Sequence, residues 1–173
     1  SLLINYSYIP YPYSIYNRVW KLTPGQILEL QLPLSNSKNQ YKPKSWWNLN
    51  DTILNGSDKL IEDDVEATLL IEENLKRSIK YTSRADVKLT TFLSGGVDSS
   101  LITAILQSQS SERVNTFTVG FQNKDLNEAP YAKSISDYLN TNHTQLNFTD
   151  KNALDIVPKL HDYYTEPFAD PAS

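Results

Sequence analysis

Hydrophobic positions in the second half of the chain alternate between the spacing of strands and the spacing of helices. Short runs of β-branched and aromatic residues, suited to buried strands, lie at residues 87–92, 114–120 and 145–148. Helical spacing follows each run, at residues 99–109, 129–140 and 151–163. Strands that alternate with amphipathic helices predict right-handed crossovers, and therefore an α/β fold with a mostly parallel sheet flanked by helices.

A longer helix is predicted ahead of this alternation, at residues 61–81. Its apolar residues recur at four-residue spacing, with acidic side chains in its first turns and basic side chains in its last. Each charge lies at the end that the helix dipole favours. Either Asp58 or Asp63 is expected to cap its N-terminus.

The first sixty residues show a different pattern. Residues 1–16 are rich in Tyr and Pro, which predicts an extended segment. Strands are predicted at residues 19–22 and 26–32, joined into a β-hairpin by a type II turn at Thr23-Pro24-Gly25. Polar and turn-forming residues predict two connections, at residues 33–44 and 51–59.

Composition limits the class of protein. The 173 residues are 39% hydrophobic and 21% charged, which is ordinary for one globular domain. A net charge of -4 argues against a nucleic-acid partner, and no run is long enough for a membrane span. The absence of cysteine excludes disulfides and thiolate chemistry from these residues and suits the cytoplasm. Because the chain begins with Ser1 and has no Met, we expect a piece of a larger protein.

Candidate chemistry lies in the loop Ser94-Gly95-Gly96-Val97-Asp98-Ser99, between a predicted strand and a predicted helix. Ligands of parallel sheets gather at the carboxyl ends of the strands. Glycines let backbone N–H groups approach an anion closely, and the first helical turn adds free N–H groups and the positive end of the dipole. The loop is therefore a candidate phosphate site.

Asp98 narrows the kind of phosphate site. The loop lacks the three glycines of a dinucleotide fingerprint, the lysine of a P-loop and the Gly-x-Ser-x-Gly of a nucleophile elbow. An acidic side chain would repel a pyrophosphate unless Mg²⁺ lies between them, so it predicts a metal. The open alternative is that Asp98 or Ser99 is only a helix N-cap after a glycine turn.

The loop also carries a family resemblance. Leu93-Ser94-Gly95-Gly96-Val97-Asp98-Ser99-Ser100 resembles the pyrophosphate loop of the N-type ATP pyrophosphatases, and the chain is most similar to their glutamine-hydrolysing asparagine synthetases. Four other parts of the chain resemble landmarks of that family: Phe117-Thr118-Val119-Gly120-Phe121, Asn127-Glu128-Ala129-Pro130-Tyr131-Ala132, His143 and Glu166-Pro167-Phe168-Ala169-Asp170. Three further segments resemble the tail of the family's glutaminase domain: Tyr8-Ile9-Pro10, Lys21-Leu22-Thr23-Pro24-Gly25 and Trp46-Trp47.

The resemblance implies an adenine nucleotide α-hydrolase-like fold and a reaction. Residues 1–57 would be the end of a glutaminase domain with a linker, and residues 58–173 the first part of the synthetase domain. With ATP and Mg²⁺, such an enzyme converts the side-chain carboxylate of aspartate to an acyl-adenylate, which ammonia from glutamine then attacks. Alternatives are an amidotransferase that acts on a sugar acid of surface polysaccharide, another ATP pyrophosphatase, and a non-catalytic nucleotide-binding domain. A homodimer is left open.

By the same resemblance, the site residues divide into three groups. Pyrophosphate would be held by Ser94, Gly95, Gly96, Ser99 and Ser100, with Asp98 acting through Mg²⁺. Leu93 and Val119 would border the adenine, Val119 through its backbone. Glu166 and Asp170 are candidates for the acceptor side, the alternative being loop hydrogen bonding around Pro167. Both histidines, His143 and His161, are expected to be structural because no ligand cluster surrounds them.

Some family features are not among these residues. The N-terminal cysteine nucleophile, a second Ser-Gly-Glu-Gly-x-Asp-Glu motif and a downstream lysine are missing. We therefore expect no synthetase activity from these 173 residues alone. An assay for AMP release from ATP tests this expectation, and AMP release by the purified chain would contradict it.

Overall fold

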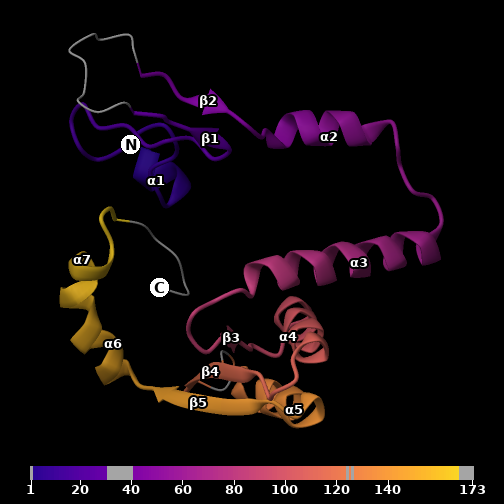
Figure 1. Cartoon of the computed structure of the whole chain (residues 1–173). Helices are drawn as coiled ribbons and strands as arrows, with labels where there is room; N and C mark the ends of the chain where they lie inside the picture. Colours follow the sequence, from indigo (N-terminus) through magenta and orange to yellow (C-terminus); the bar gives the residue numbers. More distant parts are fainter. Residues whose placement is uncertain (1, 31–40, 124, 126, 168–173) are drawn as a thin grey trace. The chain divides into compact units, whose positions relative to one another are not determined.

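The computed structural model describes residues 2–30, 41–123, 125 and 127–167 (Figure 1). The chain divides into two compact units, one of Ser1–Leu60 with Pro158–Ser173 and the other of Ile61–Val157. Within the described ranges, none of the helices combines the length and the apolar character needed to span a bilayer.

A three-stranded parallel sheet forms the centre of the Ile61–Val157 unit (Figure 1). Its strands β3 (Thr90–Phe92), β4 (Asn115–Phe121) and β5 (Asn142–Phe148) lie in the order β3-β4-β5. The predicted parallel sheet flanked by helices is thus confirmed. β3 is shorter than predicted, and β5 begins at Asn142 rather than at residue 145.

Helices connect and cover these strands. They are α3 (Asp64–Thr82), α4 (Val97–Gln109) and α5 (Ala129–Leu139). Ile79 of α3, Ile105 and Leu106 of α4 and Val114 before β4 form a buried apolar cluster, against which Leu75 packs. Burial of these side chains holds α3 against α4 and α4 against the sheet.

The two faces of the sheet differ in their side chains. Thr91 and Thr116 lie opposite each other on the face toward α4, where the Thr91 hydroxyl lies 3.2 Å from the Thr103 hydroxyl of that helix. Phe92 and Phe117 lie on the other face in an edge-to-face pair, with ring centroids 5.9 Å apart. Period-2 alternation therefore sends the hydroxyls to the helices and the aromatic rings to the opposite face.

Side-chain caps explain where the helices begin. The Asp63 carboxylate accepts a hydrogen bond of 2.7 Å from the Glu66 N–H, so Asp63, rather than Asp58, caps α3. α4 begins at Val97, two residues earlier than predicted, with Gly96 as its N-cap. The alternative in which Asp98 or Ser99 is the N-cap is therefore wrong, since both lie inside the first turn.

The single helix predicted at residues 151–163 is wrong. The chain instead forms α6 (Asp150–Ile156), a 3₁₀ turn (Val157–Lys159) and α7 (Leu160–Tyr163). Pro158 lies in the 3₁₀ turn; it lacks an N–H group and its ring clashes with the preceding helical turn, which interrupts the helix. A capping box between Thr149 and Asn152 starts α6.

The other unit contains α1 (Leu2–Tyr6), β1 (Gln26–Ile27), β2 (Lys44–Ser45) and α2 (Leu49–Ser57). β1 pairs antiparallel with β2, so the predicted pairing of residues 19–22 with residues 26–32 is wrong. Instead, Lys21 is tied to the earlier chain, because its N–H donates to the Pro12 carbonyl at 2.9 Å. Residues 33–40 of the predicted loop lie outside the described residues.

Local turn chemistry in this unit is partly as predicted. The Gln26 N–H donates to the Thr23 carbonyl at 3.1 Å and Gly25 has φ +77°, as a type II turn requires. The turn-rich connection predicted at residues 51–59 is wrong, because Asn48 caps a helix there by accepting from the Asn50 N–H at 2.9 Å. Residues 2–6 are helical rather than extended, since the prolines that argued against a helix follow at Pro10 and Pro12.

Candidate functional site

The candidate loop begins at Leu93, immediately after β3. Leu93 is buried, its N–H donates to the Phe117 carbonyl at 2.9 Å, and its own carbonyl accepts from the Thr118 hydroxyl. Both polar backbone groups of Leu93 are therefore used by β4. This anchor fixes where the loop leaves the sheet.

Gly95 is the point at which the loop meets α5. Its φ of +93° belongs to the region that favours glycine. A Cβ at this position would lie 2.6 Å from the Tyr131 Cβ and 3.2 Å from the Ala132 nitrogen. The loop can therefore take this path only because residue 95 has no side chain, and the first turn of α5 forms one wall of the site.

Gly96 has a different role, because its backbone is ordinary. Its φ of -75° and ψ of 164° are extended, and a Cβ would meet only the Ser94 Oγ, at 3.4 Å. Neither strain nor packing requires glycine here. The missing side chain keeps the space in front of the α4 N-terminus open.

Serine hydroxyls line the same turn. The Ser94 and Ser99 Oγ atoms lie 2.9 Å apart, and the Ser94 N–H donates to the Ser99 Oγ at 3.2 Å. The Ser100 hydroxyl donates to the Gly96 carbonyl at 2.6 Å. These bonds close the loop onto α4 and place three hydroxyl groups around the helix terminus.

Unused backbone donors point out of the first turn of α4. Among the hydrogen bonds of the described residues, none uses the N–H groups of Val97, Asp98 or Ser99. An α-helix leaves its first N–H groups without internal partners, and its dipole places partial positive charge there. The terminus can thus donate several hydrogen bonds to one anion.

Asp98 is exposed in this first turn. Within the described part of the chain, no three His, Cys, Asp or Glu side chains are grouped to hold a metal ion. One exposed carboxylate beside an open helix terminus fits a Mg²⁺ that takes its other ligands from water and phosphate, which is the usual way this ion is bound with nucleotides. They do not fit a metal held by protein ligands alone.

Val119 and the acceptor-side candidates lie in different places. Val119 is half-buried in β4, two residues beyond Phe117 and on the same face. Glu166 belongs to the other unit, where both of its carboxylate oxygens have partners, and Asp170 lies outside the described residues. The loop residues 93–100 are thus brought together with α5, and the binding role of each residue stays a prediction.

His143 has a structural environment in β5. Its Nδ1 lies 2.9 Å from the Thr116 hydroxyl, while its Nε2 is buried without a partner among the described residues. Burial lowers the pKa of His143, nearby Lys133 lowers it further, and Asp137 acts in the opposite direction. Burial and Lys133 thus disfavour the protonated imidazole in the folded chain.

Sequence reasoning missed the residues that support the loop. Thr118 binds the Leu93 carbonyl, Thr103 donates to the Ser99 carbonyl at 2.7 Å, and Tyr131 packs against Gly95. Alternation in β4 places Thr118 on the helix-facing side, so its position was readable from the pattern. The contact of α5 with Gly95 was not, because no local signal specifies it.

A cavity of about 480 Å³ lies away from this loop, near the C-terminal ends of α3 and α4. Its lining includes Lys80, Leu89, Leu106 and Gln109. Its lining does not include residues 93–100.

Comparison with known proteins defines the class. The family model described as asparagine synthase matches residues 70–173, which include the sheet, the loop and α4 to α7. The chain belongs to the asparagine synthase family.

Individual relatives carry matching names. The chain is 34% identical over 167 residues to the putative glutamine-hydrolyzing asparagine synthetase 2 of Methanocaldococcus jannaschii, covering 94% of this chain and 30% of that protein. It is 23% identical over 171 residues to the glutamine-hydrolyzing asparagine synthetase 1 of Bacillus subtilis, covering 98% and 25%. The chain thus spans less than a third of the length of either relative.

Proposed function

We propose that this chain supplies the pyrophosphate-binding half of an ATP-dependent, glutamine-hydrolysing amidotransferase that forms asparagine from aspartate. The observation that supports this most is the junction at residues 93–100, where free N–H groups, serine hydroxyls and one carboxylate surround a helix N-terminus inside the family-matched region. The names of the relatives support the reaction and the acceptor.

The chain's own residues would act mainly by electrostatics. In the proposed reaction an aspartate carboxylate oxygen attacks the α-phosphorus of ATP, and negative charge grows on the departing pyrophosphate. The N–H groups of Val97, Asp98 and Ser99 and the Ser94 hydroxyl are already oriented by the loop, so they stabilise that charge without reorganising. Ammonia from glutamine then displaces AMP from the activated carboxyl group.

Asp98 would hold Mg²⁺ beside the phosphates. The metal supplies positive charge to the phosphate oxygens when bound. Without a cation, the negative charge of Asp98 repels an anion at this helix terminus. Pyrophosphate binding therefore depends on the cation. We therefore propose that binding to this chain requires Mg²⁺ as well as the nucleotide.

Isothermal titration calorimetry with ATP and MgCl₂ tests the proposal. We expect Asp98→Ala to abolish the Mg²⁺ dependence of binding, and Gly96→Val to weaken binding about tenfold or more by filling the open space at the helix terminus. Asp64→Ala is the matched control, because Asp64 is also an exposed acid in a first helical turn, that of α3. A Mg²⁺ dependence that persists in Asp98→Ala, or that is lost equally in Asp64→Ala, would contradict the proposed role of the loop.

The acceptor needs a separate test with a protein that contains this chain and a complete synthetase domain. We expect pyrophosphate release from ATP to depend on aspartate. Pyrophosphate release that depends on a hexuronic acid instead would show that the acceptor is a sugar acid rather than aspartate. The proposed ATP site would be unaffected. If the protein binds ATP but releases no pyrophosphate with any carboxylate tested, the remaining alternative is a non-catalytic nucleotide-binding domain.

A further inference from the structure

A side-chain hydroxyl takes the place of a backbone donor where β3 ends. β3 and β4 pair in parallel only as far as Phe92 and Phe117, and the Leu93 N–H then donates to the Phe117 carbonyl at 2.9 Å. In a regular parallel ladder the next bond runs from the Val119 N–H to the Leu93 carbonyl. The buried Thr118 hydroxyl donates to this carbonyl instead. The backbone ladder therefore stops where the candidate loop begins.

The Val119 N–H points toward β3 but has no partner there. Successive residues of a strand direct their N–H groups to opposite sides. The Asn142 N–H donates to the Val114 carbonyl at 2.9 Å, so even-numbered residues of β4 face β5 and odd-numbered ones face β3. No hydrogen bond between residues that the structure describes uses the Val119 N–H. β4 thus presents a free backbone donor near its carboxyl end.

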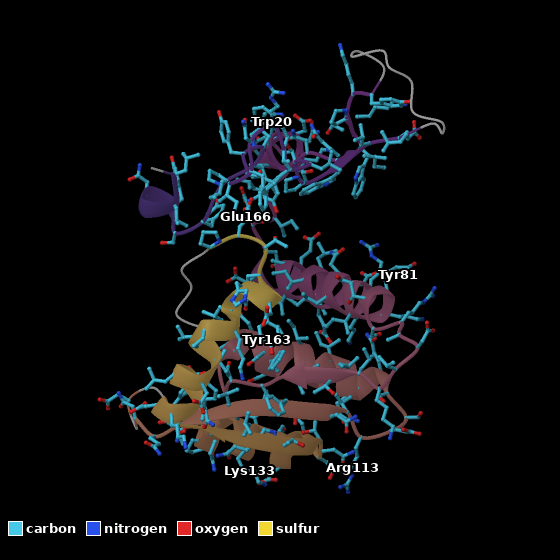
Figure 2. The ribbon with its side chains drawn as sticks, turned by 90° about the vertical axis from the view of Figure 1, so that its left-hand side faces the viewer. Trp20, Tyr81, Arg113, Lys133, Tyr163 and Glu166 are labelled. Carbon is cyan, nitrogen blue, oxygen red and sulfur yellow. The ribbon has the colours of Figure 1, made fainter. Side chains whose placement is uncertain are left out.

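This free donor lies at the edge of the sheet that carries the candidate loop. Arg113, labelled in Figure 2, precedes β4, so Val119 lies toward the opposite end of that strand. The next N–H on the same side, that of Phe121, donates to the Asn127 side chain at 3.3 Å. Val119 is half-buried, and almost all backbone donors shielded from solvent have partners. The unpaired N–H is therefore placed to meet a ligand atom.

Other buried hydroxyls of this unit do not have the same role. Thr103, Thr116 and Thr118 are each at most 3% exposed. The Thr103 hydroxyl donates to the Ser99 carbonyl within α4, a bond that joins no separate elements. The Thr116 hydroxyl lies 2.9 Å from the His143 Nδ1 of β5. Of these three threonines, Thr118 is the one that ties the start of the loop to a neighbouring strand.

We propose that Thr118 is a positioning residue of the nucleotide site. Its hydroxyl fixes the point where the loop leaves the sheet and keeps the Val119 N–H available to a hydrogen-bond acceptor of the bound nucleotide. This inference rests on the proposed function. Without a donor at position 118, the buried Leu93 carbonyl would lack a partner, which is costly. The Val119 N–H is the next donor of the ladder, so it takes that carbonyl and is lost to the ligand.

Hydrogen exchange of the 173-residue chain without ligand tests the free donor. We expect the Val119 amide of the wild-type chain to exchange about tenfold or more faster than the Thr118 and Gly120 amides, which face β5. Thr118→Val slows exchange of the Val119 amide by about tenfold or more, because this N–H gains the Leu93 carbonyl. A substitution that only loosened the strand would have the opposite effect.

Thr116→Val is the matched control, because Thr116 is equally buried on the same face of β4. We expect it to leave the Val119 exchange unchanged, and Thr118→Ser, which keeps the hydroxyl, to retain the wild-type rate. Unchanged or faster Val119 exchange in Thr118→Val overturns the proposal. A wild-type Val119 amide as protected as those of Thr118 and Gly120 also overturns it, and this comparison does not depend on the folding of any variant.

Calorimetry with ATP and MgCl₂ tests the positioning role. We expect Thr118→Val to weaken binding about fivefold or more, and Thr118→Ser and Thr116→Val to change it by less than about twofold. Equal losses in Thr118→Val and Thr116→Val, or no loss in Thr118→Val, overturn the positioning role.

Failure of this inference and failure of the proposed function are separable. Absence of ATP binding by the wild-type chain overturns the proposed function and with it the positioning role of Thr118. The exchange rate of the Val119 amide, measured without ligand, still decides whether the Thr118 hydroxyl keeps this donor free.

Discussion

The two adjacent glycines of the loop have different structural roles. Gly95 allows a backbone conformation and a close approach of α5, whereas Gly96 leaves space in front of a helix terminus. A substitution at the first position affects folding, and a bulky one at the second affects access to the N–H groups. We therefore expect substitutions at Gly95 to change stability and, under the proposed function, bulky substitutions at Gly96 to change phosphate binding.

Substitution by alanine should reveal this division. We expect Gly95→Ala to lower the free energy of unfolding by about 2 kcal/mol or more, because alanine at this φ is strained and its Cβ meets Tyr131. Gly96→Ala, in an ordinary conformation, changes it by less than about 1 kcal/mol. Urea unfolding followed by circular dichroism measures both, and equal effects would contradict the assignment.

Single residues also show what the sequence could and could not predict at the site. The composition of residues 94–99 indicated an anion loop, because glycines and hydroxyl groups before a helix N-terminus suit the binding of an anion. The partners of Leu93 and Gly95 could not be predicted, since Thr118 and Tyr131 come from elements whose packing depends on the complete fold. The same holds for the ion pair of Lys21 with Glu166.

At the scale of elements, the start of α3 offers a test of capping. Both Asp58 and Asp63 fitted the sequence pattern, but only Asp63 accepts a hydrogen bond from the first turn of the helix. We expect Asp63→Ala to lower the free energy of unfolding by about 1 kcal/mol. Asp58→Ala, the matched control, has an effect below about 0.5 kcal/mol, measured in the same urea titration. A larger effect at Asp58 would contradict the cap.

The contact of β5 with its neighbours predicts a pH dependence. The pKa of His143 is lowered from 6.5 in the folded chain, so the unfolded chain binds a proton more readily at this position. The stabilisation is complete above pH 6.5 and is lost as the pH falls through the folded-state value. Lys133 and Asp137 of α5 are the charged groups that act on this imidazole.

Stability curves at several pH values measure this effect. We expect His143→Gln to flatten the pH dependence of unfolding below pH 6.5, whereas the exposed His161→Gln retains it. An unchanged slope in His143→Gln would contradict the role of its half-buried imidazole.

Elements were predictable where the pattern was regular. Runs of β-branched and aromatic residues identified β3, β4 and β5, and helical spacing identified α3 to α5. α2 was missed because its only local signal, the Asn48 cap, precedes a stretch rich in turn-forming residues. The β1–β2 pairing was missed because it joins strands across residues 31–40, where no pattern fixes a register.

At the scale of the molecule, the two compact units do not have the same residue ranges as the two domains predicted from the sequence. Residues from Pro158 onward group with the first sixty residues, although the family match assigns them to the synthetase sequence. The boundary predicted between residues 57 and 58 stays a prediction. The first and last parts of the chain nevertheless share a unit through Glu166, which no local pattern indicates.

The central claim is that the helix terminus at residues 94–100 binds pyrophosphate. Amide chemical shifts in a ¹H–¹⁵N spectrum, recorded during titration with pyrophosphate and MgCl₂, test it most directly. We predict saturable shifts in the Ser94 to Ser100 amides, largest for the N–H groups of Val97, Asp98 and Ser99, that disappear without Mg²⁺. Shifts confined to residues around the cavity near Leu89 and Leu106, or no shifts at millimolar pyrophosphate, would contradict it.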